Sequence, residues 1–166
     1  MPYPGGNIIR VKPTLSTSIY ADGDVLFNPF EVKNAVSSRG GVSKLHDIFV
    51  IDYDEDTWGA DLFLTQASGT LGTINATANI SDADFSAMKL CSVYRHIQST
   101  GKSQDLDNIN INKCMTLADS AEGVNATLLQ AEPNSTSIYI SGVLNTGSPT
   151  FAAEDNIEII LNIEYL

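Results

Sequence analysis

The chain alternates short apolar segments with polar turns, and residues 45–66 show this pattern most clearly. Two apolar runs, rich in β-branched and aromatic residues, flank an acidic tip at residues 52–57. Such runs suit a pleated, half-buried surface better than a helix, and an acidic tip is costly to bury. We therefore expect a β-hairpin with a solvated turn over residues 45–66, at the centre of an all-β domain.

Similar segments recur to the end of the chain. We expect strands at residues 8–15, 25–27, 90–97, 110–117, 126–131, 137–144 and 157–165. Pro13 places the first at a sheet edge because proline cannot donate to a ladder, and Asn28-Pro29 should end the second. Eight or nine short strands spaced by Gly, Pro, Asn and Ser indicate an antiparallel two-sheet sandwich, with a jelly roll as the natural candidate.

Two further segments complete the expected organisation. Ser81 is an N-cap candidate, with acids in the following turn, and predicts one short helix at residues 82–88. Residues 1–7, with two prolines and two glycines, predict a flexible N-terminal arm. A chain of 166 residues suits one core, so residues 8–166 are expected to form a single β-sandwich domain.

The charge distribution limits the classes of partner. A net charge of −11 argues against nucleic acid, whose phosphates require clustered Lys and Arg. Residues 1–44 nevertheless carry a net charge of +2 and the remainder −13, so the first quarter could dock on an acidic partner. The alternative is that the strands in the first quarter carry fewer acidic residues by chance, with no role in docking. No apolar run is long enough for a membrane helix or a signal peptide, so we expect a soluble protein synthesised in the cytoplasm.

The residues that usually carry catalysis are sparse. His46 and His96 both lie in expected strands and are interpreted as sheet-face residues, and no nucleophile elbow or phosphate-binding loop occurs. We expect no enzyme activity and no cofactor. Cys91 is expected to be a buried free thiol, with a bridge between Cys91 and Cys114 as the alternative.

The acidic tip matches part of a calcium-binding pattern. Asp52, Asp54 and Asp56 alternate as in an EF-hand loop, but Thr57 and Phe63 stand where that loop requires Gly and Glu. The EF-hand interpretation therefore fails, and a solvated turn is preferred over a calcium site of another type. Trp58, which follows this tip, is interpreted as a cap on the end of the sandwich, with an exposed anchor for a partner or sugar as the alternative.

Several short motifs stand in an order that resembles a known group of proteins. They are residues 16–25, Gly40-Gly41, the apolar segment ending in Asp52, residues 60–64, and residues 80–84 before the expected helix. The order resembles that of small virion proteins of tailed bacteriophages, in particular β-sandwich capsid decoration (cement) proteins. The likeness covers roughly residues 8–97.

The resemblance implies a structural role without catalytic residues. Such a protein would sit on the outer capsid surface, bridge adjacent major capsid proteins and form a symmetric homo-oligomer, with a dimer favoured over a trimer. The residues expected to contact the capsid or another subunit are Tyr3, Pro4, Ile8, Arg10, Lys12 and Trp58. The alternative function is a glycan- or host-binding module of a head fibre or tail, with Trp58, Tyr3, Tyr20 and Tyr53 as stacking platforms.

Overall fold

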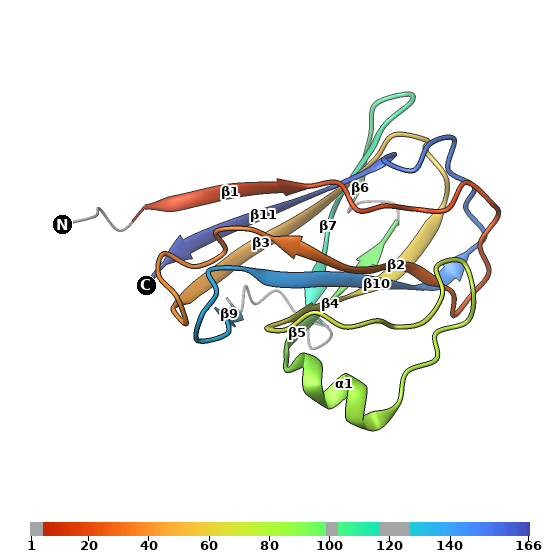
Figure 1. Ribbon diagram of the computed structural model, residues 1–166. Helices are drawn as coiled ribbons and strands as arrows, with labels where there is room; N and C mark the ends of the chain where they lie inside the picture. Colours follow the sequence, from red (N-terminus) through yellow and green to blue (C-terminus); the bar gives the residue numbers. More distant parts are fainter. Residues whose placement is uncertain (1–4, 99–102, 117–126) are drawn as a thin grey trace.

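The computed structural model describes residues 5–98, 103–116 and 127–166, which contain eleven strands and one short helix (Figure 1). The elements are β1 (Gly6–Val11), β2 (Val25–Val32), β3 (Val42–Asp52), β4 (Trp58–Thr65), α1 (Asp82–Met88), β5 (Leu90–Ile97), β6 (Ser103–Asp105), β7 (Asn110–Lys113), β8 (Met115–Thr116), β9 (Thr127–Gln130), β10 (Ile138–Gly147) and β11 (Ile157–Tyr165).

The strands form two antiparallel sheets. The first sheet has the order β1-β11-β3-β7-β6, with β9 paired to the beginning of β3, and the second has the order β2-β10-β4-β5-β8. The two halves of the chain pair with each other: β1 with β11, β2 with β10, β3 with β7, and β4 with β5. This is a long antiparallel hairpin rolled into two layers, which is the jelly-roll arrangement. The expected all-β, jelly-roll-like sandwich with one short helix is confirmed.

The core lies between the two sheets because alternate residues of each strand face inward. In β11 the inward residues are Ile157, Ile159, Leu161 and Ile163, all almost fully buried. Inward residues of both sheets belong to one continuous apolar cluster. Burial of each large aliphatic side chain contributes about 1.5–3 kcal/mol, so this cluster is the main source of stability.

The expected hairpin over residues 45–66 is wrong. β3 pairs with β11, β7 and β9 in the first sheet, whereas β4 pairs with β10 and β5 in the second. Residues 53–57 carry the chain from one sheet to the other. Asp52 is also buried rather than solvated. Its Oδ2 accepts a 2.7 Å hydrogen bond from Nε1 of the buried Trp58, which compensates for the lost contact with water.

Two strand boundaries near the N-terminus differ from expectation. β1 begins at Gly6, so Gly6 and Asn7 pair with β11 and do not belong to an arm, and it ends at Val11. β2 continues through Asn28 and Pro29 instead of ending there. The register with β10 shifts at this point, and β2 is an edge strand, so the missing proline N–H breaks no ladder hydrogen bond inside the sheet.

The segment at residues 110–117 forms two strands and not one. β7 belongs to the first sheet and β8 to the second, and Cys114 lies between them with its backbone N–H donating to the Ile48 carbonyl at 2.8 Å. Cys114 is buried, Cys91 is half-buried, and both are free thiols. Burial raises the pKa of both thiols above the ordinary value. The free state expected for Cys91 is confirmed, but its full burial is not.

The outer face of the second sheet is covered by the chain itself. Residues 66–89 cross this face and include α1, which lies on the side away from the first sheet (Figure 1). Ser81 caps α1 as expected, since its Oγ accepts a hydrogen bond from the Asp84 N–H at 3.1 Å. Phe63 of β4 packs edge-to-face on Phe85 of α1, with ring centres 6.1 Å apart. The covering segment therefore has its own small apolar cluster.

Candidate docking surface

The outer face of the first sheet carries an apolar group of side chains. Phe49 and Ile51 of β3 point outward, as do Ile111 of β7 and Ile160 of β11. Phe49 stands opposite Ile160, and Ile51 stands opposite Ile111, so the four are cross-strand neighbours. We call these four residues the outer patch. They are only partly buried, and no described segment packs over them as residues 66–89 pack over the second sheet.

Paired charges surround the outer patch. Arg10 lies 3.2 Å from Glu158, His46 lies 2.9 Å from Glu164, and Lys113 forms an ion pair with Asp47. The register of β3 shifts at His46, because Asp47 pairs with Asn162 and Leu45 pairs with Ile163. His46 and Asp47 therefore both lie toward the outside.

With Lys44, the described residues of this face include three basic and three acidic side chains, so their formal net charge is zero when His46 is neutral.

The second feature is the free edge of β1. β1 pairs with β11 on one side, and no described strand pairs with its other side, so alternate backbone N–H and C=O groups face outward along six residues. Ile8 on this strand is 62% exposed. We call Gly6–Val11, with the side chains of Ile8 and Arg10, the β1 edge.

The other sheet edges in the described parts of the chain are short or occupied. β6 and β8 have three and two residues. β2 is longer, but the Asn28 side chain donates to the Gly72 carbonyl and accepts from the Leu71 N–H, both at 2.8 Å. Single bridges also join Asp24 and Val25 to residues 74–77. The β1 edge is therefore the longest uncovered pairing surface among the described residues.

A small polar network fixes the basic side chains beside the β1 edge. Tyr53 donates its phenol hydrogen to Glu158 at 2.7 Å, and Arg10 contacts the other oxygen of that carboxylate. The Nζ of Lys12 lies 5.2 Å from the centre of the Tyr53 ring and 3.6 Å from Asp155. The hydrogen bond raises the pKa of Tyr53 and, with Arg10, holds the pKa of Glu158 below its usual range. Arg10 and Lys12 are thereby held on the same side of β1.

The structure brings together only part of the predicted contact set. Ile8, Arg10 and Lys12 lie along or directly after β1, whereas Tyr3 and Pro4 lie outside the described residues. Trp58 is 1% exposed and packs within the sandwich, 5.9 Å from the Phe151 ring and 4.1 Å from the His96 ring. The alternative of Trp58 as an exposed anchor is therefore wrong.

The two histidines do not form a reactive site. His46 lies on the outer face of the first sheet, whereas His96 is buried in the second sheet with no hydrogen-bond partner for either nitrogen among the described residues. Burial lowers the pKa of His96 from 6.5 to about 3, so it is neutral at physiological pH. Within residues 5–98, 103–116 and 127–166, no three His, Cys, Asp or Glu residues are grouped to hold a metal ion.

Two carboxylates of residues 53–57, the acidic link between β3 and β4, have structural partners. The Oδ2 atom of Asp54 accepts from the Ala152 N–H at 2.7 Å and from the Asn156 side-chain amide. Asp56 accepts from the Thr150 N–H at 2.7 Å. The acids of the link thus hold the loop before β11 in place.

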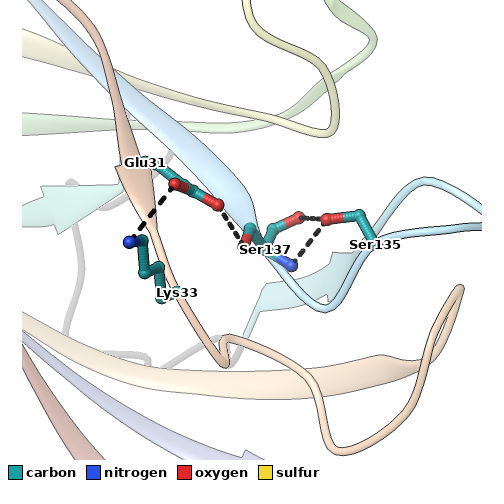
Figure 2. A network of polar contacts seen from close by, with 4 residues as sticks. All are labelled: Glu31, Lys33, Ser135 and Ser137. Atoms are coloured by element: carbon teal, nitrogen blue, oxygen red, sulfur yellow. Dashed lines mark hydrogen bonds and ion pairs between the residues drawn. The ribbon is translucent and has the colours of Figure 1, made fainter.

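A further polar network joins β2 to the turn before β10 (Figure 2). Ser137 donates its hydroxyl to Glu31 at 2.8 Å, and its N–H donates to the Ser135 Oγ at 2.9 Å. Lys33 approaches the second oxygen of Glu31 at 4.0 Å. Figure 2 shows that these four side chains point toward one another, so we assign the network a structural role at the end of the β2–β10 pair.

Sequence analysis missed the outer patch. A signal for it was present, because residues 48–51 are all apolar, whereas a strand with one solvated face should alternate. The interpretation as a hairpin assigns one face of this strand to water, so it gives no reason to expect an apolar outer face.

The part of the chain that the structure describes contains no helix long and apolar enough to cross a membrane. Comparison of the chain with protein-family models, with curated proteins and with solved structures found no match. A functional interpretation therefore depends on the fold, its surfaces and the sequence resemblance described above.

Proposed function

We propose that this protein is a structural protein of a tailed-bacteriophage virion, a capsid decoration protein that binds the major capsid protein and bridges adjacent copies of it. The proposed location is the outer capsid surface. The observation that supports this function best is the β1 edge, an uncovered strand with an exposed isoleucine in a compact jelly roll.

A free strand edge suits contact with another protein. Its outward N–H and C=O groups can pair with an extended segment of a partner, and alternate side chains then contribute specificity. Arg10 and Lys12 offset Glu158 and Asp155 beside this edge, so in a chain of net charge −11 a partner segment meets little electrostatic repulsion here. Strand addition therefore gives a physical route to capsid attachment.

The acidic composition also fits a protein that coats a shell. A net charge of −11 keeps individual copies apart in solution and favours solubility at high concentration. The glycan-binding alternative has lost two of its stacking platforms, because Trp58 and Tyr20 are buried. Tyr53 is partly exposed, but its ring is occupied by Lys12. No observation now favours that alternative over capsid binding.

Co-sedimentation with expanded empty capsids of the phage that encodes this chain tests the proposal. We expect saturable binding that Ile8→Glu weakens about tenfold or more, corresponding to about 1.4 kcal/mol, because a charge replaces an exposed apolar contact beside the paired backbone. Ile19→Glu is the matched control, since Ile19 is 66% exposed but lies in the loop between β1 and β2. Equal capsid binding by both variants, or no binding by the wild-type chain, would contradict the proposal.

A further inference from the structure

The outer faces of the two sheets differ in how far other segments of the chain cover them. On the second sheet, the outward side chains of Phe63 and Val143 are packed under residues 66–89, next to Phe85 and Met88. On the first sheet, the outer patch has a comparable apolar character and no such cover among the described residues. Contiguous apolar groups at the centre of an open sheet are unfavourable in water unless another surface covers them.

The size of the first sheet is sufficient for a specific contact. At about 16 Å² per strand residue, from the strand spacing and the rise per residue, its strands other than β1 cover roughly 500 Å². Two such faces in contact bury on the order of 1,000 Å², which is about the minimum for a specific protein–protein interface. The face is also long enough for two sheets to pack with their strands nearly aligned.

The charge of this face indicates which partner covers it. Two copies of a chain with net charge −11 repel each other over most of their surfaces. With His46 neutral, the described residues of this face have zero formal net charge, and the acids Asp47, Glu158 and Glu164 all contact a basic or histidine side chain of the same molecule. Among the described residues, this face offers no unpaired acidic group to attract a basic partner, but it lets a second copy approach with little repulsion.

We propose that two copies of this chain pack the outer faces of their first sheets against each other, with Phe49, Ile51, Ile111 and Ile160 at the centre. The contact is isologous, so the same four residues meet on both sides of a two-fold axis, and the paired charges form its rim. This inference stands apart from the capsid function, since it concerns the free protein. If both hold, each dimer presents two β1 edges, which raises the avidity for a repeating shell.

Light scattering coupled to size-exclusion chromatography tests the dimer on the full chain without capsids. We expect a mass of twice 17.8 kDa for the wild-type protein. Ile51→Glu and, separately, Ile111→Glu place a charge in the patch and should weaken dimerisation by about tenfold or more. Ile19→Glu, outside the sheet, should leave the dimer intact, and circular dichroism confirms that each variant is folded. A monomeric wild-type protein, or folded patch variants that dimerise normally, would overturn the inference.

A salt titration of the wild-type protein tests the same contact without any substitution. Screening of the repulsion between two acidic bodies should tighten an apolar, locally neutral interface, so the dissociation constant should fall as sodium chloride is added. A dissociation constant that rises with salt would instead indicate a contact between opposite charges and would exclude the proposed face. A monomer in which the outer patch becomes protected only on capsids would likewise overturn self-association and assign the patch to the capsid.

Discussion

Two ionisable residues, Asp52 and His96, lie in the interior beside Trp58, and the fold tolerates each of them in a different way. The carboxylate of Asp52 accepts hydrogen bonds from the Trp58 indole at 2.7 Å and from the Asp54 N–H at 2.9 Å. Burial nevertheless raises the pKa of Asp52 above its ordinary value. His96 packs against the Trp58 ring, with the ring centres 4.1 Å apart, and is neutral. The buried tryptophan therefore contacts both a carboxylate and an uncharged imidazole.

His96 should make the protein sensitive to mild acid. Its pKa is about 3 in the folded state and 6.5 in the unfolded chain, so the unfolded chain takes up the proton first as the pH falls. The stabilisation is complete above pH 6.5 and is lost as the pH falls toward 3. We expect the free energy of unfolding to decrease by about 2 kcal/mol between pH 6.5 and about pH 5 from this residue alone. Urea denaturation at a series of pH values measures it.

The matched variant is His96→Phe, which keeps a ring against Trp58 but cannot bind a proton. Its stability should change less over this pH range than that of the wild-type protein. Asp52 acts in the opposite direction, because its raised pKa makes the folded state bind a proton before the unfolded chain does as the pH falls. A wild-type protein and a His96→Phe variant with equal pH dependence between 5 and 6.5 would contradict the buried, neutral state of His96.

At the scale of elements, the link between β3 and β4 is fastened to the loop before β11. Asp54 accepts from both the Ala152 N–H and the Asn156 amide, and the Tyr53 N–H donates to the Asn156 carbonyl at 3.0 Å. Asp54→Ala removes the acceptor of two donors. We expect a loss of about 1–3 kcal/mol in the free energy of unfolding, measured by chemical denaturation at neutral pH.

Asp22→Ala provides the control for this variant, since Asp22 is an exposed acid in the turn before β2. Removing one negative charge from a chain of net charge −11 is common to both variants, so a difference between them isolates the hydrogen bonds of Asp54. If the two variants are equally stable, the acids of the link are solvated and do not fasten the loop.

The elements that sequence patterns predict well are those decided by local chemistry. β5 and α1 have the expected bounds, because alternation defines the first and the Ser81 cap defines the second. Strand pairing was predicted less well, since the inward–outward period of β3 and β4 is the same whether they pair with each other or lie in different sheets. The link between β3 and β4 was expected to be a solvated turn, because nothing in the sequence indicates that Trp58 and Asn156 supply hydrogen-bond donors to its acids.

The candidate surfaces could be predicted only in part, because local sequence does not determine which strands become neighbours. The first strand was expected at an edge because of Pro13, and β1 does lie at an edge, but Pro13 falls two residues beyond its end. The outer patch depends on which strands become neighbours: Phe49 meets Ile160, more than a hundred residues away in the chain, only after the sheet order is known. A set of cross-strand contacts of this kind cannot be read from any one segment.

At the scale of the whole molecule, the jelly roll leaves two surfaces without cover among the described residues. One is the β1 edge, which presents backbone groups and basic side chains, and the other is the neutral outer face of the first sheet. β1 begins where β11 ends, at one end of the sandwich (Figure 1). We propose that the edge binds the capsid protein and that the face binds a second copy. The same compact body would then serve assembly on two sides.

Hydrogen exchange of the capsid-bound protein, measured by mass spectrometry against the free protein, tests the attachment through β1 most directly. Backbone amides that pair with a partner strand become protected from exchange. We predict that the amides of Gly6–Val11 that face away from β11 gain protection on binding to expanded capsids, while those of β5 and α1 exchange as before. Unchanged exchange across Gly6–Val11, with protection confined to other strands, would contradict attachment through the β1 edge.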